Sequence, residues 1–168
     1  MRLFRTAIIA CALLAASCGG NDQNEVGEFK NDFAGNEIKV QALKDPKVTG
    51  VTCHLTHFDR GFWDRVSKGN WFEDPSNASI ACRQTGVISV GDIDLDKNGE
   101  EVFSQRVSLV FKSIAVRRIY DAENDTLLYI VYSRRPIEGS AKMGISTISL
   151  YGQKNAPEIL KQIEKNDR

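Results

Sequence analysis

Hydrophobic and polar residues alternate along much of the chain, and a period of two predicts β-strands rather than helices. The stretch 37–43, EIKVQAL, is the clearest case, because Ile38, Val40 and Ala42 fall on one face of a strand. Runs rich in β-branched and aromatic residues predict the other strands. These runs cover 48–58, 79–85, 87–90, 101–112 as one or two strands, 114–121, 126–133 and 144–150.

Two of these strands predict a hairpin with a defined register. Residues 122–125, AEND, form a connection of the length that hairpins use. If Asp121 pairs with Thr126, Arg118 lies opposite Tyr129 in the same ladder. Apolar residues occupy both faces of the two strands, so we expect the hairpin to lie centrally in its sheet and to be covered on both sides.

Helical patterns are short by comparison. Residues 61–70, GFWDRVSKGN, predict a short helix or a structured loop, and 156–168 predict an amphipathic terminal helix. Pro157 lies in the first turn of that helix, and Glu158 lies near the positive end of its dipole. The expected fold class is mainly β: a β-rich α+β domain, built as an antiparallel sandwich or a partly open barrel with one or two short helices.

The N-terminal region has the pattern of an export signal. Arg2 and Arg5 precede the apolar stretch 6–16, which is too short to span a bilayer stably. Compact residues then precede Cys18, and this arrangement suits processing as a bacterial lipoprotein. Ordinary signal-peptidase cleavage is the alternative. We interpret 1–17 as a signal peptide and Cys18 as the lipidation site.

The residues after Cys18 are glycine-rich and polar, so we interpret 18–28 as a flexible tether. The segment 29–155 is long enough to form one domain with a hydrophobic core before the terminal helix at 156–168. Gly19, in place of an aspartate, predicts the outer rather than the inner membrane. The expected location is therefore the periplasm, with an anchor in the outer membrane.

The charge of the chain is balanced. It has 22 basic and 22 acidic residues, and removal of the signal peptide takes away two arginines, which leaves a net charge of −2. This balance, without a nucleic-acid motif, excludes nucleic acid as an expected partner. We expect an unknown envelope protein or small ligand as the partner, no cofactor, and contact with the membrane only through the lipid anchor.

Two cysteines remain in the predicted domain, Cys53 and Cys82, and an even pair in an oxidising compartment predicts a disulfide. Closing this loop would stabilise the fold by roughly 3–4 kcal/mol. The alternative is a soft metal held by both thiolates and His57, which shares a strand face with Cys53, whereas His54 points the other way. With the disulfide formed, we expect both histidines to be partly exposed.

The stretch 92–103, DIDLDKNGEEVF, resembles the first half of a calcium-binding loop. The candidate ligands are Asp94, Asp96, Asn98 and Glu100. Gly99 holds the position where such a loop turns sharply, but Gln105 replaces the bidentate glutamate that completes the site. We therefore expect an acidic hairpin turn, with structural calcium as the alternative.

Aromatic and arginine-rich stretches supply the remaining candidates for binding. The candidate binding surface is the aromatic set Phe58, Phe62, Trp63, Trp71 and Phe72. Core packing is one interpretation of this set, and an exposed surface for a sugar, a peptide or a partner protein is the other. The pairs 117–118 and 134–135 are consecutive arginines, which point to opposite sides of a strand, so salt bridges are favoured over a shared anion site.

Several phrases of the sequence are similar to those of one bacterial family. They are GEFKNDFAGNEIKV, LKDPKVTGVTCHLTHF, EDPSNASIACRQTG, GEEVFSQRVSLVFKSIAVRRIYD and TLLYIVYSRRPIEGSAKMGISTISL. From Gly27 to Leu150 the chain resembles the CreA-like proteins of Gram-negative bacteria. The resemblance implies a small exported protein without an established activity. It also supports the disulfide, since both cysteines lie inside these phrases, whereas a lipoprotein-type cysteine departs from the family pattern.

Signatures of catalysis are missing from the sequence. It has no Gly-x-Ser-x-Gly, Ser-x-x-Lys or His-Glu-x-x-His pattern and no phosphate-binding loop. We therefore expect a non-enzymatic binding or accessory module of the envelope. The alternative is a carboxylate-based hydrolase of envelope glycans, which would need two carboxyl groups about 5–9.5 Å apart across a cleft.

Overall fold

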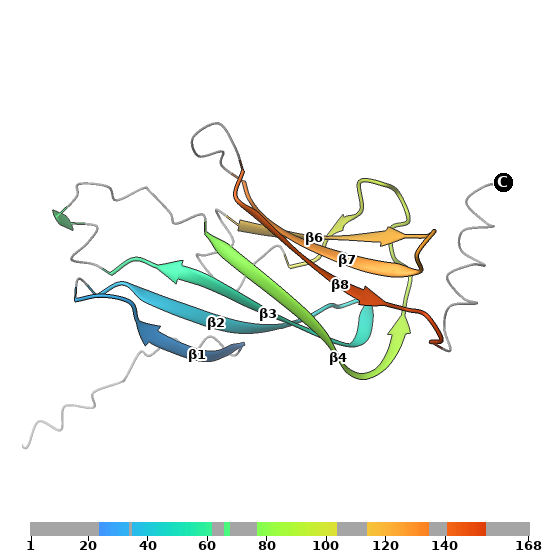
Figure 1. The fold of residues 1–168 in the computed structure, drawn as a ribbon, viewed down its shortest axis with the longest axis horizontal. Helices are drawn as coiled ribbons and strands as arrows, with labels where there is room; N and C mark the ends of the chain where they lie inside the picture. The colour runs from blue at the N-terminus through green and yellow to red at the C-terminus, as the bar shows by residue number, and fades with distance from the viewer. Residues whose placement is uncertain are drawn as a thin grey trace, which may run out of the picture.

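Two four-stranded sheets make up the protein in the computed structural model, which describes residues 24–33, 35–61, 66–67, 77–103, 114–134 and 141–153. The strands are β1 (Glu25–Lys30), β2 (Glu37–Lys44), β3 (Val48–Asp59), β4 (Ala78–Val90), β5 (Glu100–Glu101), β6 (Ile114–Asp121), β7 (Thr126–Ser133) and β8 (Met143–Ser149). Figure 1 shows β1, β2 and β3 in one layer and β6, β7 and β8 in the other.

Chain order and spatial order are the same within each sheet. Sheet A runs β1-β2-β3-β4 and sheet B runs β5-β6-β7-β8, and every neighbouring pair is antiparallel. Antiparallel neighbours can be joined by a short turn, as between β2 and β3 and between β6 and β7, whereas β3 and β4 are joined by the longer segment 60–77. The prediction of a mainly β, antiparallel fold is confirmed.

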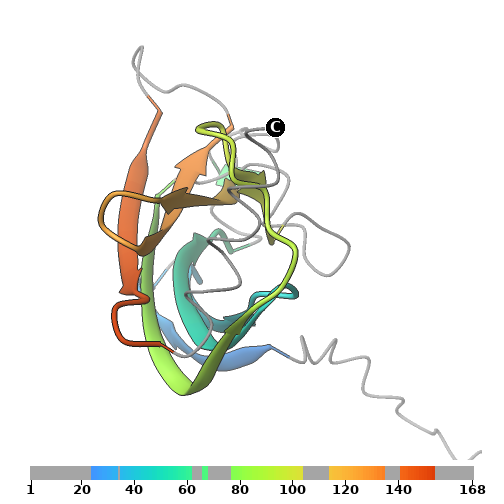
Figure 2. The ribbon, with the colours of Figure 1, turned by 90° about the vertical axis from the view of Figure 1, so that its right-hand side faces the viewer.

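The two sheets meet along their edge strands β4 and β8. The backbone N–H of Cys82 on β4 donates a hydrogen bond of 2.8 Å to the side-chain hydroxyl of Ser146 on β8. Gly144 lies against the backbone oxygen of Ala78 at the same boundary. Viewed end-on, the sheets curve around a common interior (Figure 2). They form a partly open structure, because β4 and β8 share no backbone ladder.

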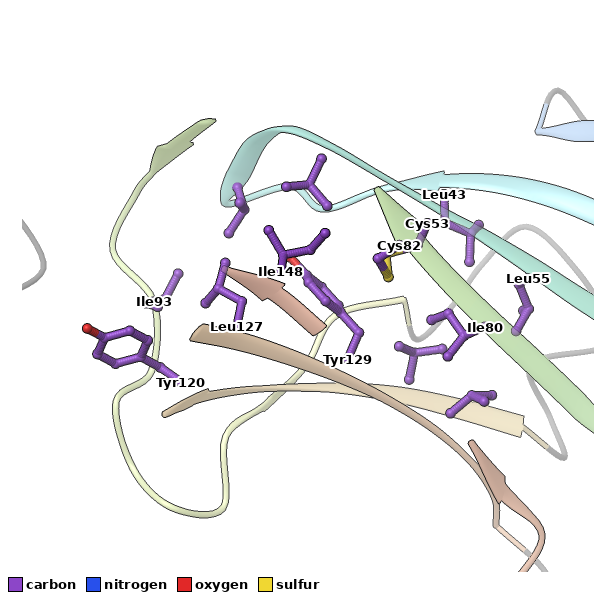
Figure 3. Close-up of a cluster of buried hydrophobic side chains, with 14 of the residues drawn as sticks. Leu43, Cys53, Leu55, Ile80, Cys82, Ile93, Tyr120, Leu127, Tyr129 and Ile148 are labelled. Atoms are coloured by element: carbon purple, nitrogen blue, oxygen red, sulfur yellow. A yellow bond between two sulfur atoms is a disulfide. The ribbon is translucent and has the colours of Figure 1, made fainter. Parts of the chain in front are cut away.

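The core fills the space between the sheets. Its buried side chains alternate along the strands with exposed ones, as the period of two predicts. The main members are Leu43, Val51, Leu55, Ile80, Ile88, Ile114, Val116, Leu127, Val131 and Ile148. Figure 3 shows Cys53, Cys82 and Tyr129 among these apolar side chains.

The predicted hairpin is present with the predicted register. Asp121 pairs with Thr126 and Arg118 with Tyr129, and β6 and β7 are the two central strands of sheet B. The prediction of cover on both sides is met on one side only. The inner side chains are buried, whereas outward-facing ones such as Ile130 are half-buried.

Three elements differ from the sequence prediction. β1 begins at Glu25, so the last four residues of the predicted tether at 18–28 belong to a strand. Its side chains are almost all exposed, which explains why no core-forming pattern marks it. The strands predicted at 79–85 and 87–90 form one continuous strand, β4. Of the strand predicted at 101–112, Glu101 belongs to β5 and Val102 and Phe103 are not in a strand, whereas 104–112 lie outside the described residues.

Some predictions concern residues that the structure does not describe. They include most of the helix or loop predicted at 61–70, of which 66–67 are helical, and the terminal helix at 156–168. Residues 1–17 and Cys18 also lie outside the described part of the chain. Among the described residues, no helix is long and apolar enough to cross a membrane.

Candidate functional site

A buried arginine is the most unusual feature of the interior. Arg118 on β6 is 1% exposed and is among the largest fully buried side chains of the protein. Its Nη1 lies 2.6 Å and 2.5 Å from the two carboxylate oxygens of Asp45, in the turn between β2 and β3. Its Nη2 donates to Glu100 on β5 at 2.7 Å. One guanidinium therefore connects sheet A to sheet B.

Asp45 accepts further hydrogen bonds at its fully buried carboxylate. The hydroxyl of Tyr129 donates to Oδ2 at 2.9 Å, and the backbone N–H of Lys47 donates to Oδ1 at 2.8 Å. Burial, together with the negative charge of Asp45, raises the pKa of the Tyr129 phenol. Tyr129 therefore stays protonated and acts as a donor, which its place against a carboxylate requires.

Lys47 completes a group of four charges. Its Nζ lies 2.8 Å from Oε1 of Glu100, at the edge of the interior, where Glu100 is 30% exposed. Two carboxylates thus balance one arginine and one lysine. Within the described residues, only Nε of Arg118 lacks a hydrogen-bond partner in this group. We call Asp45, Lys47, Glu100, Arg118 and Tyr129 the charge network.

The charge network has the geometry of an internal clamp. Buried ion pairs are tolerated when their hydrogen bonds are nearly complete, and removing one partner commonly costs about 3–5 kcal/mol. Asp45 and Glu100 bind the same guanidinium, so this carboxylate pair is engaged in holding Arg118. The arrangement favours a structural role for both acids.

The sequence analysis did not identify Asp45, which lies between the strands predicted at 37–43 and 48–58. Asp45 and Arg118 are 73 residues apart, and no local pattern relates them. One signal was present in the sequence, because the predicted hairpin register placed Arg118 on the same face as Tyr129. A charged residue on an inner face requires a partner from another element.

The acidic stretch forms a turn between β4 and β5. The Asp94 carboxylate accepts a hydrogen bond from the backbone N–H of Asp96 at 2.9 Å, and the backbone N–H of Gly99 donates to the Asp96 carbonyl. The Asn98 carbonyl accepts from Arg117, and the Glu100 carboxylate belongs to the charge network. In the described part of the chain, no three His, Cys, Asp or Glu side chains group closely enough to hold a metal ion.

The predicted disulfide joins Cys53 on β3 to Cys82 on β4. The two residues are directly paired across the strands, with Cα atoms 3.9 Å apart, and both are buried. Both sulfurs are consumed, so they do not form the metal site considered with His57. His57 shares the inner face of β3 with Cys53 and is only 2% exposed. The prediction that both histidines are partly exposed is therefore wrong for His57 and holds only for His54. The reason is that the inner face of β3 is covered along the length that includes His57.

The predicted aromatic surface is described at one residue. Phe58 is half-buried on β3, opposite Ile38 of β2 and on the side of sheet A that faces away from the core. The other four residues of the set lie outside the described part of the chain: Phe62, Trp63, Trp71 and Phe72.

Of the two arginine pairs, the one that the structure describes in full, Arg117 and Arg118, does not form a shared anion site. Arg117 points away from Arg118 and donates to the backbone carbonyls of Asn98 and Gly99. Arg134 forms an ion pair with Glu101, and its neighbour at 135 is not described. The prediction that these arginines form salt bridges holds for Arg118 and Arg134.

Comparisons with known proteins place the chain in a family. A family model described as "CreA protein" matches residues 26–153. The chain is 42% identical over 123 residues to "Protein CreA" of Escherichia coli strain K12, covering 71% of this chain and 76% of that protein. The same values hold for "Protein CreA" of Escherichia coli O157:H7. No solved structure gives a significant match. The extent and identity of these matches show that the chain belongs to the CreA family.

Proposed function

We propose that this CreA-family protein is an exported, lipid-anchored binding or accessory module of the bacterial cell envelope and that it has no catalytic activity of its own. The disulfide between Cys53 and Cys82 carries the first part of the proposal. Disulfides persist in oxidising compartments and are rare in the cytosol. A directly paired, buried disulfide therefore supports the interpretation of 1–17 as an export signal.

The charge network fits a structural role better than a catalytic one. A catalytic acid or base must reach a substrate, and its pKa must suit proton transfer. Asp45 and Arg118 are fully buried and bonded to each other, and the Tyr129 hydroxyl is bonded to Asp45. These groups stabilise the domain and leave recognition to its surface.

Cell fractionation tests the proposal. The full chain, expressed in a Gram-negative host, is expected in the outer-membrane fraction, with a mass that corresponds to loss of residues 1–17 and addition of lipid at Cys18. Cys18→Ser is expected to move the protein into the soluble envelope fraction. A matched Ser17→Ala variant, which keeps a compact residue before the cysteine, should remain with the membrane.

Two results would contradict the proposal. A parent protein already found in the soluble envelope fraction would refute lipid anchoring and leave export intact. A parent protein found in the cytoplasm with residues 1–17 still attached would refute export as well.

A further inference from the structure

The outer side of sheet A has an uneven distribution of charge. Side chains of β1 to β4 alternate between the core and this outer side, which we call the outer face. It has an apolar row formed by Phe29, Ile38 and Phe58, paired in register across three strands. Basic residues lie further along the same face: Lys44, His54 and Arg83, all exposed. The remaining outward positions are mainly alanine, threonine and serine.

Acidic residues of these strands point to the opposite side. In the strand register Glu37 lies opposite Asp59, and Glu28 lies opposite Lys39. Lys39 in turn lies opposite His57, which points inward. Lys39 forms ion pairs with Asp59 at 3.1 Å and with Glu28 at 3.7 Å. Among the described residues of β1 to β4, no aspartate or glutamate points outward. In a chain with as many acids as bases, the outer face is therefore locally positive.

Exposed phenylalanines lie at the end of sheet A where the apolar row of this face is found. Phe29 on β1 is 57% exposed, and Phe33, in the turn between β1 and β2, is fully exposed. A phenyl ring exposed to water is unfavourable, and exposed rings at one end of a face with basic residues further along it match the composition of surfaces that lie at a membrane interface.

The position of the predicted anchor brings this face close to a bilayer. β1 begins at Glu25, seven residues after Cys18. Even a fully extended chain of that length spans only roughly 25 Å. A lipid on Cys18 would therefore hold sheet A within a short distance of the headgroups. At that distance the effective concentration of headgroups around a basic and apolar face is high.

We propose that the outer face of sheet A binds the surface of an anionic phospholipid bilayer, so that the protein lies against the membrane. The orientation rests on the lipid anchor of the proposed function, but the affinity of the face does not require it. Lys44 and Arg83 attract the anionic headgroups, and Phe29 and Phe33 enter the interfacial region.

Vesicle co-sedimentation tests the face without the lipid. The full chain carrying Cys18→Ser is exported, its loss of the leader is confirmed by mass, and it is mixed with vesicles of phosphatidylethanolamine and phosphatidylglycerol or of phosphatidylcholine alone. We expect binding to the anionic vesicles that weakens with salt. Each basic residue near an anionic surface contributes roughly fivefold in affinity, so Lys44→Glu with Arg83→Glu should weaken binding at least about tenfold.

Matched variants separate surface binding from general effects. Lys97→Glu with Lys142→Glu reverses two exposed charges in the loops beside sheet B and should leave binding unchanged. Phe29→Ser with Phe33→Ser should weaken binding at every salt concentration, because the loss is apolar. Melting of each variant must match that of the Cys18→Ser parent.

The outcomes distinguish this proposal from the proposed function. Equal binding by the Lys44/Arg83 and Lys97/Lys142 variants, or equal binding to both kinds of vesicle, would overturn the membrane-facing role even if Cys18 is lipidated. Binding that depends on the outer face would support the role even if fractionation shows that Cys18 carries no lipid. Failure to bind any vesicle would overturn it and leave an acidic partner protein as the candidate ligand of this face.

Discussion

The guanidinium of Arg118 on β6 binds both carboxylate oxygens of Asp45, in the turn before β3, and this pair connects the two sheets inside the core. Neither side chain is accessible to water, with exposed fractions of 1% and 0%. The pair is therefore neutral overall but costly to separate, since a lone charge in this interior would be neither paired nor hydrated.

Removing one member of this pair should destabilise the fold strongly. Asp45→Ala leaves Arg118 buried without its main partner, and we expect a loss of about 3–5 kcal/mol in the free energy of unfolding, measured by urea denaturation. Adding Arg118→Met to Asp45→Ala should recover part of the loss, because the unpaired charge is gone. Glu101→Gln, which breaks the partly exposed pair with Arg134, is the control and should cost less than about 1 kcal/mol. Equal losses for the buried and the peripheral pair would contradict the prediction.

The buried phenols predict a loss of stability in alkaline solution. Burial and a hydrogen bond to Asp125 raise the pKa of Tyr120 to about 12, from an ordinary value of 10.0, and Tyr129 is shifted in the same direction. A raised pKa in the folded state favours the protonated form there. The stabilisation is therefore complete below pH 10 and is lost as the pH rises towards 12. Tyrosinate absorbance should show ionisation of these two phenols at a higher pH than in the urea-unfolded chain.

Replacing each tyrosine with phenylalanine shows how much of the alkaline loss of stability belongs to Tyr120 and how much to Tyr129. Tyr129→Phe also removes the donor to Asp45, so it should cost about 1–3 kcal/mol at neutral pH, where a buried acceptor loses a partner. Tyr120→Phe should cost less, because Asp125 is only half-buried. A Tyr129→Phe protein with unchanged stability at neutral pH would show that the phenol does not support Asp45.

The disulfide should contribute measurably to stability. Replacing both Cys53 and Cys82 with alanine is expected to lower the free energy of unfolding by roughly 3–4 kcal/mol in non-reducing buffer. Reducing agent should destabilise the parent protein and leave the double variant unchanged, which separates the bond from the loss of the sulfur atoms. If the parent and the variant melt together without reductant, the bond does not form in the protein.

Gly99 tests the packing of the acidic turn, and Gly35, between β1 and β2, is its control. Gly99 and Gly35 both have positive φ, at 59° and 80°. A Cβ at Gly99 would lie 2.1 Å from the Arg118 carbonyl oxygen, whereas nothing lies within 4 Å of one at Gly35. Gly99→Ala should therefore destabilise the protein more than Gly35→Ala, by at least about 1 kcal/mol beyond the shared backbone strain. Similar melting of the two variants would show that β5 can move away from β6.

Local patterns predicted the strands of the fold to different degrees. β6 and β7 were located to the residue, together with their register, because a four-residue turn and two strongly β-forming runs define each other. β1 was missed because an exposed edge strand needs no apolar alternation. Gly86 suggested a break in β4, but the strand continues through it and takes up the irregularity as a shift in register opposite Gly50.

Contacts between distant segments were less predictable than strands. The disulfide was inferred correctly because only two cysteines remained to be paired in the predicted domain. The partner of Arg118 was not inferred, because any of many acids could have taken that place. The one-sided distribution of charge on sheet A also became apparent only when the pairing of β1, β2 and β3 fixed which side chains share a face.

The edges of the two sheets that lie away from the β4–β8 boundary, β1 and β5, bear on how the protein behaves when crowded. β1 has a shift in register near Val26 and three charged side chains, and β5 has only two residues, both glutamates. Short, charged or irregular edges give a foreign strand little backbone to pair with. Copies of this protein held at high density on a surface should therefore remain individual molecules and resist forming intermolecular β-aggregates.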